Sequence, residues 1–234
     1  MTDKTKIILM YAGTAVLAVA LIGTFTWLRV AQENREKSAI EKRLAIDVGR
    51  AEKVEMARLE KDLTATNQAG EEVSISQLKD KVWVATQFFA ECPNCAARNG
   101  DHLVDLYKKY QDNPDFQMVC VSVDPETDDV ERLQEYAVNL GADISNWWFL
   151  TGDRETLHHY MEEEMKFLSV RERTNEDDIA REGRFAHDMG VAVFGKGLVM
   201  REKKDLLWAR EQSPELYEHF EQQLTSAIDK ALAE

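Results

Sequence analysis

The chain has 234 residues, of which 29 are Lys or Arg and 43 are Asp or Glu, so its formal net charge is −14. Hydrophobic residues make up 44%, and the low content of 11 Gly and 4 Pro excludes collagen-like and Pro-rich low-complexity chains. The first 30 residues hold three basic groups and one acid, a net of +2, which leaves −16 for residues 31–234. So acidic a body repels phosphate backbones, and we expect no nucleic-acid partner.

The N-terminal segment predicts a membrane anchor over residues 1–30. The run from Ile7 to Leu28 contains no charged residue, and as a helix it would span roughly 33 Å, enough to cross a bilayer core. Trp27 lies where an interfacial aromatic residue is expected. Ala18-Val19-Ala20 could be cleaved as a signal sequence, but the apolar run continues well past it. A retained transmembrane helix is therefore favoured over a cleaved signal or a buried core helix.

Basic residues lie on both sides of this span. Lys4, Lys6 and the amino terminus precede it. Those that follow it are Arg29, Arg35, Lys37, Lys42 and Arg43. Counted by the positive-inside rule, this distribution favours a cytoplasmic body.

Residues 31–61 are rich in charges and helix formers and contain no proline. Ile40, Leu44 and Val48 recur every four residues, which predicts a helical stalk with a weak apolar stripe. A solvated spacer is the favoured interpretation, and a dimerising or docking helix is the alternative.

From residue 62 to residue 234 the pattern changes to alternating strands and helices. The β-rich runs at 82–89 and 116–123 predict buried strands. Between them, a helix is expected from about residue 94 to residue 110, and Val130, Leu133, Ala137 and Leu140 give the next helix its apolar stripe.

The C-terminal part predicts a hairpin and a closing helix. Residues 191–194 and 198–200 flank Gly195-Lys196-Gly197, a hairpin loop. Ser213 is placed as the N-cap of a helix that begins with Pro214. The whole order predicts an α/β fold of thioredoxin-like type, in which a central mixed sheet is flanked by helices and forms one domain over residues 62–234.

Cys92 and Cys95 form a CxxC pair where the first predicted strand ends and a helix begins. Thiols there face unpaired backbone N–H groups and the positive end of the helix dipole, which favour the thiolate. Such thiolates can exchange with a disulfide or bind a soft metal such as Cu(I). Structural zinc would need two further ligands at short spacing, and the sequence offers no second pair. Cys120 lies within a predicted strand and is expected to fill the core.

His187 is the third candidate site residue. It precedes the hairpin strand, and in a thioredoxin-like sheet the loop before this strand faces the CxxC loop. Thioredoxin oxidoreductases place a proline here, but none of the four prolines of this chain lies nearby. A neutral imidazole beside two thiolates would complete a set of three ligands for a soft metal.

Other candidate residues receive structural interpretations. His102 is expected on the surface or core edge of its helix. His158 and His159, near Met161 and Met165, suggest an exposed charged helix, with a copper-handling patch as the less favoured alternative. Asp128 is expected to cap the helix that follows it.

These motifs resemble the Sco/SenC family of membrane-anchored thioredoxin-fold proteins. The similarity covers about residues 62–200 and is carried by VWVATQFFAECPNC, by DPETD after FQMVCVSV, by WWFLTG and by HDMGVAVFGKGLV. The resemblance implies copper as the bound metal, with Cys92, Cys95 and His187 as its ligands. It also implies a copper-centre subunit of cytochrome c oxidase, or another thiol client, as the partner. A body on the periplasmic or intermembrane-space side is implied as well.

The sequence departs from this family at the cysteine pair. The family usually has three residues between its cysteines and a proline after the second, whereas here there are two residues, and Ala96 follows. Two hypotheses result. The first is a copper-binding assembly factor. The second is a thiol-disulfide oxidoreductase in which Cys92 attacks and Cys95 resolves the mixed disulfide. A membrane-tethered binding module remains open, and a peroxiredoxin-type peroxidase is disfavoured because its proline and threonine are not in place.

Overall fold

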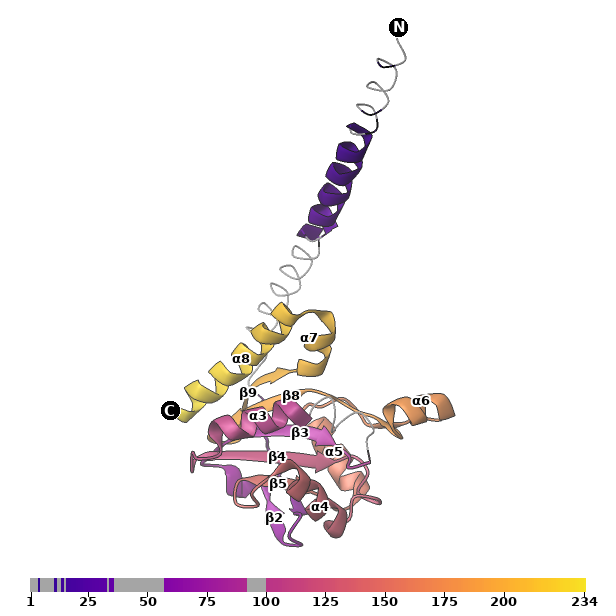
Figure 1. Cartoon of the computed structure of the whole chain (residues 1–234). Coiled ribbons are helices and arrows are strands. Elements are labelled where there is room, and N and C mark those ends of the chain that lie inside the picture. The colour runs from indigo at the N-terminus through magenta and orange to yellow at the C-terminus, as the bar shows by residue number, and fades with distance from the viewer. Residues whose placement is uncertain are drawn as a thin grey trace. The chain divides into compact units, whose positions relative to one another are not determined.

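The structure, a computed structural model, comprises two compact units, Met1–Lys53 and Val54–Glu234, both drawn in Figure 1. The residues that it describes are 4, 11, 14, 16–32, 34, 35, 57–91 and 100–234. Much of the predicted anchor before residue 16 and most of the predicted stalk therefore lie outside the described residues.

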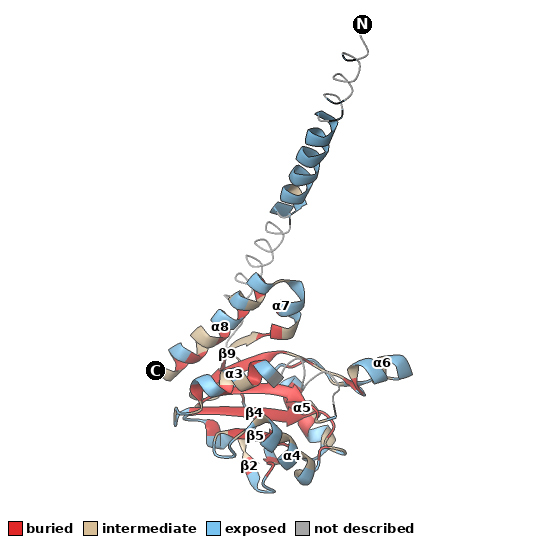
Figure 2. Cartoon of the chain, viewed as in Figure 1, coloured by how far each residue is buried: buried red, intermediate tan, exposed pale blue. Residues whose placement is uncertain are grey.

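In the first unit, residues 16–32 are helical. The apolar side chains of this helix are exposed, including Leu21 at 67% and Trp27 at 69%, and the helix is pale blue in Figure 2. The hydroxyls of Thr24 and Thr26 donate to backbone carbonyls of the same helix at 2.9 Å. Within the part of the chain that the structure describes, no helix has both the length and the apolar character needed to cross a membrane.

A five-stranded mixed sheet lies at the centre of the second unit, in the order β5-β4-β3-β8-β9. β3 (Val82–Phe88) runs parallel to β4 (Phe116–Ser122), and every residue of both strands is buried. β5 (Trp147–Leu150) is parallel to β4, β8 (Val191–Gly195) is antiparallel to β3, and β9 (Val199–Lys204) is antiparallel to β8. Strands buried on both faces are largely apolar, which is why β3 and β4 were predictable. The predicted mixed sheet is confirmed.

Helices cover one face of this sheet through aromatic contacts. The ring of Tyr110 lies 5.0 Å from that of Phe116 in β4, and its hydroxyl donates to Asp229 Oδ1 at 2.7 Å. The ring of Tyr136 lies 5.4 Å from that of Phe88. The helices of this layer are α3 (Gly100–Tyr110), α4 (Val130–Leu140) and α8 (Pro214–Leu232).

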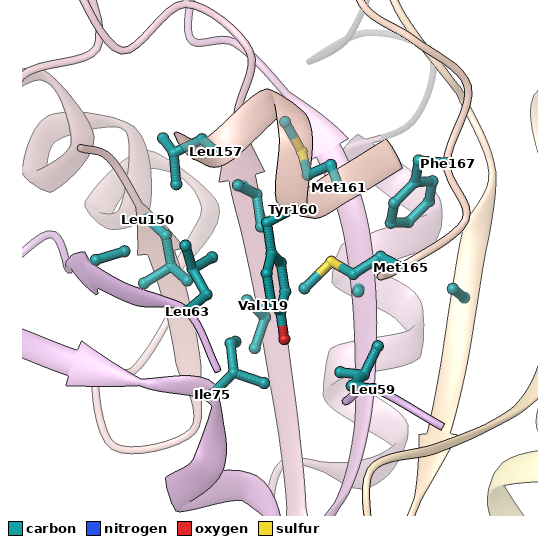
Figure 3. Packing of buried hydrophobic residues seen from close by; sticks show 14 of the residues in the cluster. Leu59, Leu63, Ile75, Val119, Leu150, Leu157, Tyr160, Met161, Met165 and Phe167 are labelled. Carbon is teal, nitrogen blue, oxygen red and sulfur yellow. The ribbon is translucent and has the colours of Figure 1, made fainter. Parts of the chain in front are cut away.

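The other face packs against α5 and the first elements of the body. Figure 3 shows Tyr160 and Met161 of this layer among Leu63, Ile75 and Val119. Successive side chains of a strand point to opposite faces, so β3 and β4 supply residues to both layers. The elements are β1 (Thr64–Thr66), β2 (Glu72–Ser74), the 3₁₀ helix η1 (Ile75–Leu78) and α5 (Arg154–Glu163).

The burial of α5 corrects one interpretation made above. Met161 and Met165 are 0% exposed, so they belong to the core and not to a copper-handling patch. Nor is the helix exposed all round, because His158 Nε2 lies 2.9 Å from the carbonyl oxygen of Val123. Its charges cover only the outer face. The sequence suggested a helix around His158 and His159 but not its burial, and β5 was not predicted.

The hairpin and the closing helix are confirmed. Gly197, in the loop between β8 and β9, has a φ of +77°, a conformation in which glycine is unstrained. Ser213 Oγ accepts a hydrogen bond from the Leu216 N–H at 3.1 Å, and Pro214 is the first residue of α8. A short helix not predicted from the sequence, α7 (Leu206–Gln212), lies between β9 and α8.

Residues 57–59 lie against the outer edge of β9. The Met200 N–H donates to the Ala57 carbonyl at 2.9 Å, and the Leu59 N–H donates to the Leu198 carbonyl at 3.0 Å. Leu59 is only 5% exposed and joins the hydrophobic core. This stretch, assigned to the stalk from the sequence, therefore packs on the body.

A small projection, called the arm below, occupies residues 171–186. It consists of β6 (Arg171–Glu172), α6 (Glu176–Glu182) and β7 (Phe185–Ala186), with β6 and β7 paired antiparallel. No residue of α6 is buried, and Figure 2 shows the helix standing away from the sheet. The chain passes from the arm directly into His187.

Candidate metal and thiol site

The segment that carries the predicted cysteine pair follows β3. After β3 ends, Phe89 is buried, Ala90 is partly buried and Glu91 is exposed. Cys92 and Cys95 themselves lie outside the described residues, and the chain is described again from Gly100, the first residue of α3. The described residues therefore define the two ends of the cysteine segment.

The predicted third ligand, His187, lies at the same edge of the sheet. β8 runs antiparallel to β3 with Thr86 opposite Val191, so the loop before β8 lies beside the end of β3. The imidazole of His187 meets the ring of Phe89 edge to face, with the ring centroids 5.6 Å apart. Phe89 precedes Cys92 by three residues.

The surroundings of His187 favour a neutral imidazole with a defined tautomer. Its Nδ1 lies 2.9 Å from the carbonyl oxygen of Asp188; because a carbonyl can only accept, Nδ1 carries the hydrogen and Nε2 carries the lone pair. Burial, with a smaller contribution from the positive charge of Arg173, lowers the pKa of His187, although its contacts with Asp188 oppose the shift. A neutral ring with its lone pair on Nε2 is the form that binds metals.

Asp188, 6% exposed, fixes the loop that carries the imidazole. Its Oδ2 accepts from the Leu168 N–H at 2.9 Å and from Lys203 Nζ at 2.5 Å. Its own N–H donates to Oε1 of Gln87 in β3 at 2.8 Å. Gln87, which we did not single out from the sequence, is 2% exposed. A glutamine inside an otherwise apolar strand was the signal that could have identified it.

Asp128 contacts the backbone that leads into the cysteine segment, and our expectation that it caps α4 was wrong. The N-cap is Asp129, whose Oδ1 accepts from the Arg132 N–H at 2.9 Å. Asp128 is instead 1% exposed and accepts hydrogen bonds from the Ala90 N–H at 3.0 Å and from Ser122 Oγ at 2.5 Å. Burial raises its pKa to about 6, against the opposing effect of these bonds. It thus anchors the backbone two residues before Cys92.

The remaining cysteine and histidine candidates are structural. Cys120 is 1% exposed, receives a hydrogen bond from Trp147 Nε1 at 3.3 Å, and has its pKa raised to about 12 by burial. It is core, as predicted. His102 is more buried than expected: burial and the charge of Arg210 lower its pKa to about 4, and Tyr217 Oη lies 2.7 Å from its Nδ1. The contacts of His102 with Arg210 of α7 and with Tyr217 of α8 tie α3 to the C-terminal helices.

The sheet order and the flanking helices define a thioredoxin-like α/β protein. Its candidate site lies where the end of β3 meets the loop before β8. The SCO1/SenC family model matches residues 51–213, and the chain belongs to this family.

Comparison with known proteins gives the same assignment. A SCO1 protein homolog of Bacillus subtilis (strain 168) is 32% identical over 124 residues, which cover 52% of this chain and 64% of that relative. BsSco, described as a member of the Sco family of cytochrome c oxidase assembly proteins with a disulfide switch, has a TM-score of 0.56 and 26% identity, and covers 74% of this chain and 95% of its own. Copper-bound ScoI of Arabidopsis thaliana shares the fold, with a TM-score of 0.52 and 18% identity over 62% of this chain and 87% of its own.

Proposed function

We propose that this chain is a membrane-tethered Sco protein that binds copper through Cys92, Cys95 and His187. In this role it assists assembly of the copper centre of cytochrome c oxidase, and its partner is the subunit that carries this centre or another thiol client. The observation that carries the proposal is the contact between the rings of His187 and Phe89, three residues before Cys92. Residues separated by almost a hundred positions thereby meet at one edge of the sheet.

The donor set suits copper as cargo. Thiolates are the soft ligands that select Cu(I), and imidazole suits copper in either oxidation state. The hydrogen bond from His187 Nδ1 to the Asp188 carbonyl is the kind of outer contact that orients a ligating imidazole. Gln87 and Lys203 hold Asp188 in turn, so the ring needs little reordering to bind.

The membrane tether rests on the N-terminal sequence. The run from Ile7 to Leu28 lacks charged residues, and the large apolar side chains described within it are exposed. Apolar surface of this extent needs an apolar environment. Thr24 and Thr26 satisfy their hydroxyls within the helix, as a lipid surrounding requires. On this proposal the body faces the periplasm or the intermembrane space, as the family resemblance implies. This orientation is opposite to the one that the count of basic residues around the span favours.

The test is anaerobic loading of the full-length chain in detergent with Cu(I), followed by X-ray absorption to count sulfur and nitrogen neighbours. Two sulfurs and one nitrogen are expected for the native sequence, and His187→Ala should lose the nitrogen. His159→Ala is the matched control, because His159 is exposed on α5 and should change nothing. A copper affinity equal to that of the double variant Cys92→Ser, Cys95→Ser would dismiss the copper proposal.

Thiol-disulfide exchange is the second candidate function. The two-residue spacing of Cys92 and Cys95 favours it, and the related BsSco contains a disulfide switch. In this chemistry the Cys92 thiolate attacks a client disulfide, the client's leaving sulfur takes a proton, and Cys95 then displaces the client to form an intramolecular disulfide. Cys95→Ser should trap the mixed disulfide with a model peptide, whereas Cys92→Ser should not. Failure of the native chain to reduce that peptide would exclude this function.

A further inference from the structure

A pocket of about 440 Å³ lies beside the cysteine segment. Its walls come from three places: the end of β3, the loop between β4 and α4, and the arm. Phe89 and Ile179 contribute apolar surface, and Glu91, Asp124 and Glu172 contribute carboxylates. Glu91 is the residue directly before Cys92, so the pocket borders the proposed site. Neither copper binding nor thiol exchange by the cysteines requires it.

Asp124 lines this pocket and has one carboxylate oxygen without a hydrogen-bond donor in the described part of the chain. The residue is 4% exposed, and its Oδ1 has no hydrogen-bond partner among the residues that the structure describes. Arg184 Nη1 lies 4.0 Å away, beyond hydrogen-bond distance, because Arg184 Nε donates to Glu172 Oε1 at 2.8 Å. Burying a charged group without hydrogen bonds is costly, and an incoming donor would remove that cost.

The chemistry of the pocket favours an organic cation over a metal ion. Within the described residues, no group of three or more potential ligands is close enough to hold a metal. Among the described residues that line the pocket, three carry carboxylates and one carries a guanidinium, that of Arg184. Glu91 is also paired with Arg132 at 2.7 Å, whereas Asp124 has no such close partner among the described residues. A long basic side chain can lay its aliphatic stem on apolar walls while its charged head reaches a carboxylate. Phe89 and Ile179 provide such walls.

We infer that this pocket receives an arginine or lysine side chain of the client polypeptide, with Asp124 as the buried acceptor. The inference rests on the proposed function for the existence of a client. It adds a recognition rule, namely that a basic residue lies near the client's cysteines. Binding in the pocket would hold the client sulfurs beside residue 92, and the arm would form the outer wall of the docked segment.

The test uses a fluorescent acetylated peptide, Gly-Ser-Gly-Arg-Gly-amide, and its twin with neutral citrulline in place of arginine. Binding to the full-length chain in detergent is followed by anisotropy at low ionic strength. Hydrogen bonds to charged groups are worth about 1.5–3 kcal/mol, so we expect the arginine peptide to bind roughly tenfold or more tightly than its twin. Asp124→Asn should abolish the difference, and Glu135→Gln, an exposed acid on α4, should preserve it.

The variants separate this inference from the proposed function. The double variant Cys92→Ser, Cys95→Ser should lose copper binding and thiol exchange but keep the preference for arginine, because the inference assigns the contact to Asp124 and not to a cysteine. If Asp124→Asn does not fold, Glu172→Gln on the exposed arm should reduce the preference instead. Equal affinity of the native chain for both peptides, or an unchanged preference in the folded Asp124→Asn variant, would overturn the inference, whatever the outcome of copper loading.

Discussion

Replacing Asp188 with asparagine tests whether its buried network holds the His187 loop. The carboxylate accepts three hydrogen bonds, from Gly190, Leu168 and Lys203. Asparagine keeps the shape but has one acceptor oxygen, and its amino group must face at least one of these donors. The change also removes the charged partner of Lys203, whose side chain is 24% exposed, although its ammonium keeps the hydrogen bond to the Lys166 carbonyl at 2.9 Å.

The magnitude follows from these contacts. Removing one partner of a buried pair costs about 3–5 kcal/mol, and we reduce this to about 2–4 kcal/mol because solvent reaches Lys203 and screens its charge. For a body of this size, 1 kcal/mol corresponds to a melting-temperature shift of about 2–4 °C, so Asp188→Asn should melt about 5–15 °C lower. Copper affinity should fall by about 10–100-fold, since the loop that orients the imidazole loosens.

The assay is thermal unfolding of the full-length chain in detergent, monitored by tryptophan fluorescence. Asp115→Asn is the matched control: Asp115 is exposed, and such changes usually stay within about 0.5 kcal/mol. If Asp188→Asn melted within about 2 °C of the control, the difference in stability would be at most about 1 kcal/mol. That result would refute the claim that this network stabilises the site.

Three further predictions concern residues outside the proposed ligand set. First, the pKa of His102 is lowered to about 4 in the folded chain, so as the pH falls the unfolded chain protonates this histidine before the folded chain does. His102 should therefore cost about 1–2 kcal/mol of stability between pH 7 and pH 5, and His102→Gln should flatten urea-measured stability over that range. Second, native alkylation with iodoacetamide, read by mass spectrometry, should modify at most two thiols, because Cys120 is buried with a pKa of about 12. Third, Met161→Ala should destabilise the body by about 2–5 kcal/mol by urea unfolding and leave the copper stoichiometry unchanged.

The sequence predicted the parts of the fold in which local pattern and tertiary burial agree. β3 and β4 are buried on both faces and largely apolar, and α8 begins at a serine cap followed by proline. Both patterns are set by residues next to one another in the chain. The arm was missed because α6 buries no residue, so no apolar stripe marks it.

Asp128 shows why cap assignment from sequence can fail by one position. Asp128 and Asp129 both precede α4, and both side chains can accept backbone hydrogen bonds. The decision is made by the buried Ser122 hydroxyl and the Ala90 N–H, which draw Asp128 inward and leave the cap to Asp129. Ser122 is the last residue of β4 and Ala90 follows the end of β3, and the sequence around Asp128 does not show that these two donors lie together.

The same reasoning explains how far the candidate site could be predicted. His187 could be proposed as a ligand only by assuming the strand order, because no residue near it in the sequence indicates that it lies close to the cysteines. The antiparallel pairing of β3 with β8 brings the loop before β8 to the end of β3. Across these two segments, Gln87 Oε1 accepts a hydrogen bond from the Asp188 N–H. Shortening this side chain with Gln87→Ala should therefore loosen the His187 loop while both strands stay paired, since the ladder between β3 and β8 uses only backbone groups.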